Sequence, residues 1–81
     1  MTFALCWNKQ PEKFIDNLPV LEAERILKKF DEIKQDPFRY AKSYQGHCFK
    51  IRVGNYRALI DVDTAQNCIE IQYIEKRENA Y

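Results

Sequence analysis

The sequence of 81 residues lacks the features that mark membrane, secreted and multi-domain proteins. No apolar run approaches the roughly 20 residues that a helix needs to cross a bilayer, and the first residues show no signal-peptide pattern. There are also no internal repeats, low-complexity tracts or linkers. We therefore expect a single domain over residues 1–81, located in the cytoplasm and not attached to a membrane.

Cysteine is scarce, and its spacing fits no common framework. Cys6, Cys48 and Cys68 are odd in number and form no C-x-x-C pair, which argues against a disulfide scaffold and a zinc ribbon. A zinc set completed by His47 is the alternative. It is disfavoured because His47 and Cys48 are adjacent and would point to opposite faces of a strand. We expect reduced thiols, no metal and no other cofactor.

The net charge is small, but the charges are segregated along the sequence. A formal net charge of +1 is by itself a weak case for nucleic-acid binding. Residues 37–60 nevertheless contain no acidic side chain and five basic ones, namely Arg39, Lys42, Lys50, Arg52 and Arg57. The middle of the sequence is therefore a candidate anion site.

The first half of the sequence predicts a strand followed by two helices. Residues 2–7 are rich in β-forming side chains. Pro11 suits a first helical turn, and Pro19 interrupts the helical spacing that follows it. Apolar side chains then recur every three or four positions over residues 20–37, and Pro37 ends this helix. We expect the two helices to form an antiparallel hairpin that covers one side of a sheet.

The second half predicts three strands in a meander. Residues 38–47 show no clear period and are interpreted as a connector. The runs 48–54, 56–63 and 68–76 each alternate apolar and polar residues with strong β-propensity. The order strand, helix, helix and three strands indicates an α+β fold.

A hairpin between the first two of these strands would set two arginines face to face. Gly54 followed by Asn55 is typical of a two-residue type II′ turn, which pairs Arg52 with Arg57. Like charges directly opposite each other destabilise a sheet by about 0.2–1 kcal/mol. In one interpretation both side chains simply extend into water. We favour a cluster with Lys50 on the face opposite the core that binds a multiply charged anion, most simply an RNA phosphate.

The end of the sequence contributes Lys76, Arg77 and Tyr81. If the last strand lies beside the hairpin, these residues emerge at one end of the same sheet. Strict alternation puts Arg77 on the core side with Tyr73, so Arg77 would have to lie beyond the end of the strand. The alternative is a frayed polar terminus.

These residues resemble the RelE-like toxins of the RelE/ParE superfamily, the toxic halves of toxin–antitoxin pairs. The resemblance covers nearly the whole sequence and rests on "KFIDNLP", "ERILKKFDEIKQDP", "FKIRVGNYRALIDVD" and "KREN" leading to the final tyrosine. The run "KIRVGNYR" is its most specific part. It implies a small curved antiparallel sheet with two helices packed on one face, in agreement with the periodicity.

The resemblance also implies an activity. RelE-like members are metal-free endoribonucleases that cut messenger RNA, in the best-understood branch within the ribosomal A site. The 2′-hydroxyl attacks the adjacent phosphate and leaves a 2′,3′-cyclic phosphate and a 5′-hydroxyl. The sequence has one histidine, so the two-histidine pair common in metal-free ribonucleases is impossible. Lysine and arginine would have to do that work.

Five residues match functional positions of the family. Lys50 matches the lysine taken as general base or charge stabiliser, and Arg52 and Arg57 match the positions that clamp the phosphate. Arg77 matches the arginine that assists the leaving 5′-oxygen, and Tyr81 the tyrosine that stacks on a base or orients the 2′-hydroxyl. Some members carry a second lysine where this sequence has Arg52, and an arginine cannot act as a base at neutral pH.

Two alternatives stay open at this point. A ParE-like chain would poison DNA gyrase without cutting RNA, although the clustered cations and terminal tyrosine favour RNA cleavage. A degenerate member would only bind its antitoxin. The endoribonuclease and both alternatives share one predicted partner, a small antitoxin whose helix or extended tail covers the basic face. The resemblance implies that the complex reaches operator DNA through the antitoxin alone.

Overall fold

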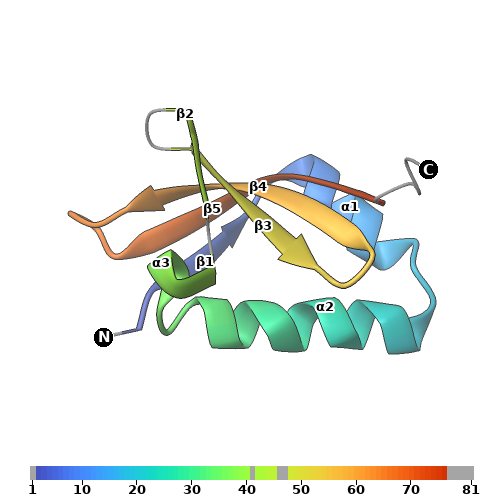
Figure 1. Ribbon diagram of the computed structural model, residues 1–81. Coiled ribbons are helices and arrows are strands. Elements are labelled where there is room, and N and C mark those ends of the chain that lie inside the picture. The colour runs from blue at the N-terminus through green and yellow to red at the C-terminus, as the bar shows by residue number, and fades with distance from the viewer. Residues whose placement is uncertain (1, 41, 46–47, 77–81) are drawn as a thin grey trace.

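A mixed sheet with a long helix along one face forms the centre of the molecule (Figure 1). The computed structural model describes residues 2–40, 42–45 and 48–76, with the backbone alone for 42–45. Its elements, in order, are β1 (Ala4–Trp7), α1 (Lys9–Asp16), α2 (Val20–Ile33), α3 (Pro37–Tyr40), β2 (Lys42–Gln45), β3 (Cys48–Val53), β4 (Tyr56–Asp63) and β5 (Cys68–Lys76). The predicted α+β class, the two helices before Pro37 and the three-stranded meander are confirmed.

The strands lie in the order β1-β5-β4-β3-β2. All neighbours are antiparallel except β1, which pairs with β5 in parallel over Ala4–Trp7. The expectation of a wholly antiparallel sheet is therefore wrong at this edge. Within the meander, tight turns reverse the chain and make neighbouring strands antiparallel. Helices follow β1 instead, so no turn fixes the direction of its pairing. The periodicity of residues in β1 does not indicate whether it pairs in parallel or antiparallel.

The interpretation of residues 38–47 as a mere connector is also wrong. Pro37 lies after the end of α2 and is the first residue of α3. A proline is well accommodated in a first helical turn. Residues Lys42–Gln45 then form β2, an edge strand that pairs with β3 through a register shift between Ser43 and Gln45. The pairing with β3 makes this segment a strand, and its own sequence has no alternation that would predict one.

The core lies between α2 and one face of the sheet. Ile26, Phe30 and Ile33 of α2 are buried, and the ring of Phe30 meets that of Trp7 edge-on at 5.2 Å. The sheet contributes the buried side chains Ile51, Val53, Tyr56, Ala58, Ile60, Val62, Ile69, Ile71 and Ile74. Burial of each large apolar side chain contributes about 1.5–3 kcal/mol, so this set fixes which face of the sheet α2 covers.

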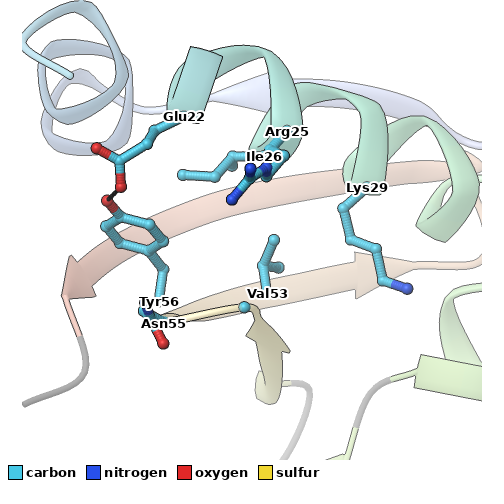
Figure 2. Close-up of a pocket in the computed structure, with 8 residues that line it drawn as sticks. Glu22, Arg25, Ile26, Lys29, Val53, Asn55 and Tyr56 are labelled. Atoms are coloured by element: carbon cyan, nitrogen blue, oxygen red, sulfur yellow. Dashed lines mark hydrogen bonds between the residues drawn. The ribbon is translucent and has the colours of Figure 1, made fainter. Parts of the chain in front are cut away.

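Tyr56 joins the sheet to the start of α2. Its ring packs edge-on against Phe14 of α1 with centroids 5.7 Å apart, and its hydroxyl donates a 2.7 Å hydrogen bond to Oε1 of Glu22 (Figure 2). That bond, then burial, then the charge of Glu22 raise the pKa of Tyr56 above its ordinary value. The phenol therefore remains a donor at neutral pH and ties β4 to the helices.

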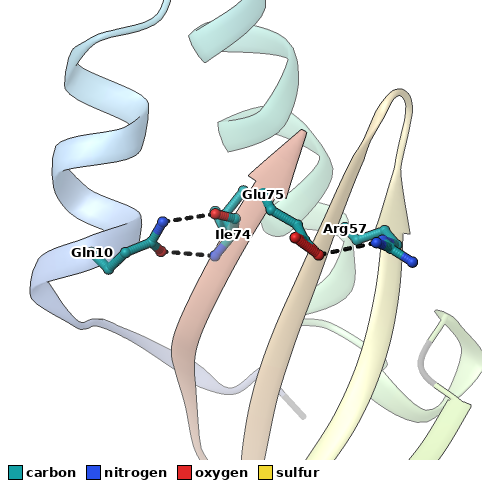
Figure 3. Close-up of polar contacts among 4 residues, drawn as sticks. All are labelled: Gln10, Arg57, Ile74 and Glu75. Carbon is teal, nitrogen blue, oxygen red and sulfur yellow. Dashed lines mark hydrogen bonds and ion pairs between the residues drawn. The ribbon is translucent and has the colours of Figure 1, made fainter. Parts of the chain in front are cut away.

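The helix α1 lies beside the free edge of β5 (Figure 3). The Gln10 amide donates from Nε2 to the carbonyl of Ile74 at 2.8 Å and accepts the Ile74 N–H at 2.9 Å through Oε1. These two bonds replace the backbone hydrogen bonds that a neighbouring strand would make with Ile74. The pairing of β1 with β5 ends at Ile71, so β1 cannot make them. A single side chain thus protects an edge that could otherwise pair with another chain.

A β-bulge in β5 decides which side chains face away from α2. The register pairs Ile60 with Ile71 but Leu59 with Tyr73, which leaves Gln72 without a partner residue on β4. The alternation is shifted by one residue beyond that point, so Ile74 is buried and Tyr73 is 42% exposed. The expectation that Tyr73 lies on the core side is wrong for this reason.

No helix in the described part of the chain is both long and apolar enough to cross a membrane.

Candidate functional site

The face of the sheet that points away from α2 carries the predicted cation cluster. We call it the open face, and its side chains include Lys50, Arg52, Arg57, Leu59, Asp61, Glu70, Tyr73 and Glu75. The predicted hairpin register is confirmed, with Arg52 opposite Arg57 and Lys50 opposite Leu59. Gly54 has a φ of 59° while Asn55 does not have a positive φ, as a type II′ turn requires.

A hollow of about 250 Å³ lies on this face. Two of the predicted site residues, Lys50 and Arg57, line this hollow. Arg52 does not line it but lies opposite Arg57 in the hairpin. The other lining residues are Ala58, Leu59, Tyr73 and Glu75. Arg77 and Tyr81 lie outside the described residues, so the structure places three of the five predicted positions.

Glu75 is a member of the site that the sequence reading missed. Its Oε2 lies 3.0 Å from Nη2 of Arg57 (Figure 3), and the two side chains are 41% and 53% exposed. An exposed pair of this kind contributes about 0–1 kcal/mol. Arginine has five N–H donors, so this contact leaves Arg57 with donors for a second anion. Glu75 competes for Arg57 without neutralising it permanently.

Tyr73 and Leu59 supply an apolar patch beside these charges. They are direct partners across β4 and β5, and both line the hollow. The sequence contains a signal for this arrangement, because Ile71 and Ile74 are three positions apart, whereas side chains on one face of a regular strand are two positions apart. The hollow therefore offers an aromatic ring and cations side by side.

The opposite end of the open face is acidic. Asp61 lies across from Glu70, and Cys68 lies next to both Asp63 and the thiol of Cys6, with a distance of 2.9 Å between the two Sγ atoms. The Cys6 hydrogen bond, then burial, then the nearby acids raise the pKa of Cys68 to about 11. This thiol therefore remains protonated at neutral pH.

A larger hollow of about 490 Å³ lies on the other side, between α2 and the β3–β4 turn (Figure 2). Arg25 and Lys29 line it, but so does Glu22, whose carboxylate holds the Tyr56 hydroxyl. The side chains Ile26 and Val53 on its wall belong to the core. We assign the site to the smaller hollow, because Lys50 and Arg57 of the predicted cluster line it.

The fold built from this sheet and its helices is that of the RelE-like toxins. Matching chains occur in the RelBE2 toxin–antitoxin complex of Mycobacterium tuberculosis, with a TM-score of 0.85 and 18% identity over 95% of this chain and 100% of that one. The RelE–RelB complex of Pyrococcus horikoshii gives 0.81 and 24%, covering 99% and 100%. The isolated Escherichia coli RelE toxin gives 0.80 and 20%, covering 96% and 87%. No protein-family model and no curated protein matches the sequence.

Proposed function

We propose that the protein is the toxin of a type II toxin–antitoxin system and acts as a metal-free endoribonuclease on messenger RNA. The observation that carries the proposal is the grouping of Lys50, Arg52 and Arg57 on the uncovered face of a RelE-like fold. All three are exposed, and two of them line one hollow. Arginine presents a planar fork of donors that suits a phosphate oxyanion.

The chemistry assigned to these residues is a transfer within the RNA. The 2′-oxygen attacks the adjacent phosphorus while the bond to the 5′-oxygen breaks, which gives a 2′,3′-cyclic phosphate and a 5′-hydroxyl. Lys50 lies by the attacking 2′-hydroxyl as a base or a charge stabiliser. Arg52 and Arg57 stabilise the extra negative charge on the phosphoryl oxygens.

Arg77 and Tyr81 complete the proposed site. Arg77 assists departure of the 5′-oxygen, which must gain the proton that the 2′-hydroxyl loses. Tyr81 stacks on a base or orients the 2′-hydroxyl. Both assignments come from the resemblance of the sequence to the RelE-like toxins.

The proposed partners follow from the same fold. The matching chains from Mycobacterium tuberculosis and Pyrococcus horikoshii come from toxin–antitoxin complexes, which supports a cognate antitoxin for this protein. We assign to the antitoxin the covering of the open face and any contact with operator DNA. Translated messages in the ribosomal A site, and hence the cytoplasm, are the proposed site of action.

Expression of the protein alone, followed by primer extension on translated messages, tests this function. We expect growth arrest with new 5′ ends inside open reading frames, and cleavage about 100- to 1,000-fold slower for Arg57→Ala. Arg25→Ala, which changes an exposed arginine of α2 outside the proposed site, is the matched control and should cut like the parent.

Two outcomes would contradict the proposal. Arrest without new RNA ends, together with a positive gyrase-cleavage assay, would favour a ParE-like inhibitor. Antitoxin binding without arrest would indicate a non-catalytic member, an alternative that the contact of Glu75 with Arg57 favours.

A further inference from the structure

Tyr73 is a large aromatic residue that lies outside the buried core. Its side chain is 42% exposed on the open face, whereas Tyr56 on the neighbouring strand is buried and hydrogen-bonded to Glu22. The hydroxyl and ring of Tyr73 make no hydrogen bond or ring contact with any other described residue. A large aromatic side chain is thus presented to solvent within the hollow that holds Lys50 and Arg57.

The β-bulge at Gln72 is what directs this ring outward. Without the extra residue, Tyr73 would face α2 and Ile74 would face solvent. Bulges of this kind often lie next to functional sites, where they re-aim a side chain. Here the bulge brings an aromatic ring to the cations of the hairpin.

A nucleotide has the two properties that this hollow combines. Its base is flat, with two faces that stack on apolar surfaces, and its phosphate is an anion one sugar away. Tyr73 and Leu59 of the hollow form an apolar surface for the base, and Arg57 and Lys50 supply positive charge for the phosphate. Basic grooves with aromatic platforms are the usual solution for single-stranded nucleic acid.

We propose that Tyr73 is a platform on which one base of a single-stranded RNA stacks while the adjoining phosphate binds Arg57. The inference rests on the proposed function and names a base-binding subsite for it. A single strand is the fitting occupant because the bases of a duplex are already stacked on one another. The acidic end of the open face, with Asp61 and Glu70, repels phosphates, so the strand continues towards the β3–β4 turn.

Binding of a short 2′-O-methyl RNA, which lacks the attacking hydroxyl, tests the platform by fluorescence anisotropy at fixed salt. Tyr73→Ala should weaken binding about 5- to 150-fold, the range measured for loss of one base stack. Tyr73→Phe should bind like the parent because the ring is kept. The matched control is Leu27→Ala on α2, whose exposure of 42% equals that of Tyr73.

An abasic scan of the same RNA separates stacking from a general loss of structure. Removal of one base should weaken binding to the parent but have no further effect on Tyr73→Ala, because each change deletes the same contact. Circular dichroism of every variant checks that it is folded.

Several outcomes would overturn the platform. If Tyr73→Ala binds like the parent while Arg57→Ala is weakened, the platform is wrong and phosphate binding stands. If Tyr73→Phe is weakened as much as Tyr73→Ala, the hydroxyl and not stacking is responsible. If Tyr73→Ala impairs binding of an acidic peptide but not of RNA, the patch serves a protein. If the parent binds no free RNA, the platform is wrong, and the proposed function is then decided separately by primer extension on translated messages.

Discussion

At the scale of single residues, Glu75 is in direct contact with Arg57, to which the proposed function assigns phosphate binding. The two side chains are in contact at 3.0 Å and both are partly exposed, so an incoming phosphate must displace the carboxylate or share the guanidinium with it. We predict that Glu75→Gln tightens binding of 2′-O-methyl RNA by about 1.4- to 5-fold, which corresponds to the 0.2–1 kcal/mol of an exposed pair.

The matched control for this prediction is Asp31→Asn. It removes an exposed carboxylate of α2, which is paired with Lys34 at 3.3 Å, and should leave RNA binding unchanged. Titration by fluorescence anisotropy measures both variants. Weaker binding by Glu75→Gln would mean that the carboxylate orients Arg57 instead of competing for it.

At the scale of elements, the junction of α1 with β5 depends on one side chain. Gln10→Ala removes both hydrogen bonds to the Ile74 backbone and opens that edge to water. Two hydrogen bonds contribute about 1–3 kcal/mol together, and each kcal/mol lowers the melting temperature of a domain this size by about 4–8 °C. We expect a drop of that order by calorimetry, with concentration-dependent light scattering from the unpaired edge. The exposed Gln35, changed to alanine, is the control, and an unchanged melting temperature for Gln10→Ala would refute the role.

The same scale shows what the sequence could and could not predict. Alternation and the Gly54-Asn55 turn were sufficient for the hairpin register, because each strand has one buried face and a slip would expose it. The contact of Arg57 with Glu75 depends on the bulge, since regular pairing would have placed Arg57 opposite Ile74. The step of three positions between Ile71 and Ile74 indicates the bulge. However, Tyr73 lies two positions after Ile71 and is itself a good β-former, so the sequence also fits a regular strand with Tyr73 on the core side.

At the scale of the whole molecule, the open face is polarised from its basic end to its acidic end. The separation of charge makes the net charge of +1 compatible with the proposed anion site. Asp61, opposite Glu70, is four positions from Arg57 along β4, about 13 Å at about 3.3 Å per residue. The Debye length is about 8 Å at 0.15 M salt and about 30 Å at 0.01 M. The acidic end therefore acts on a bound phosphate mainly at low salt.

Glu70→Gln tests this polarity. We predict that the variant binds 2′-O-methyl RNA more tightly than the parent at 0.01 M salt and nearly equally at 0.15 M, because screening removes an interaction over that distance. Glu75→Gln is the internal comparison, since its contact with Arg57 is direct and its effect should persist at the higher salt. Anisotropy titrations of the three proteins at both salt concentrations measure the difference. An equal gain for Glu70→Gln at both would mean that RNA reaches the acidic end itself, and the proposed path of the strand towards the β3–β4 turn would then be wrong.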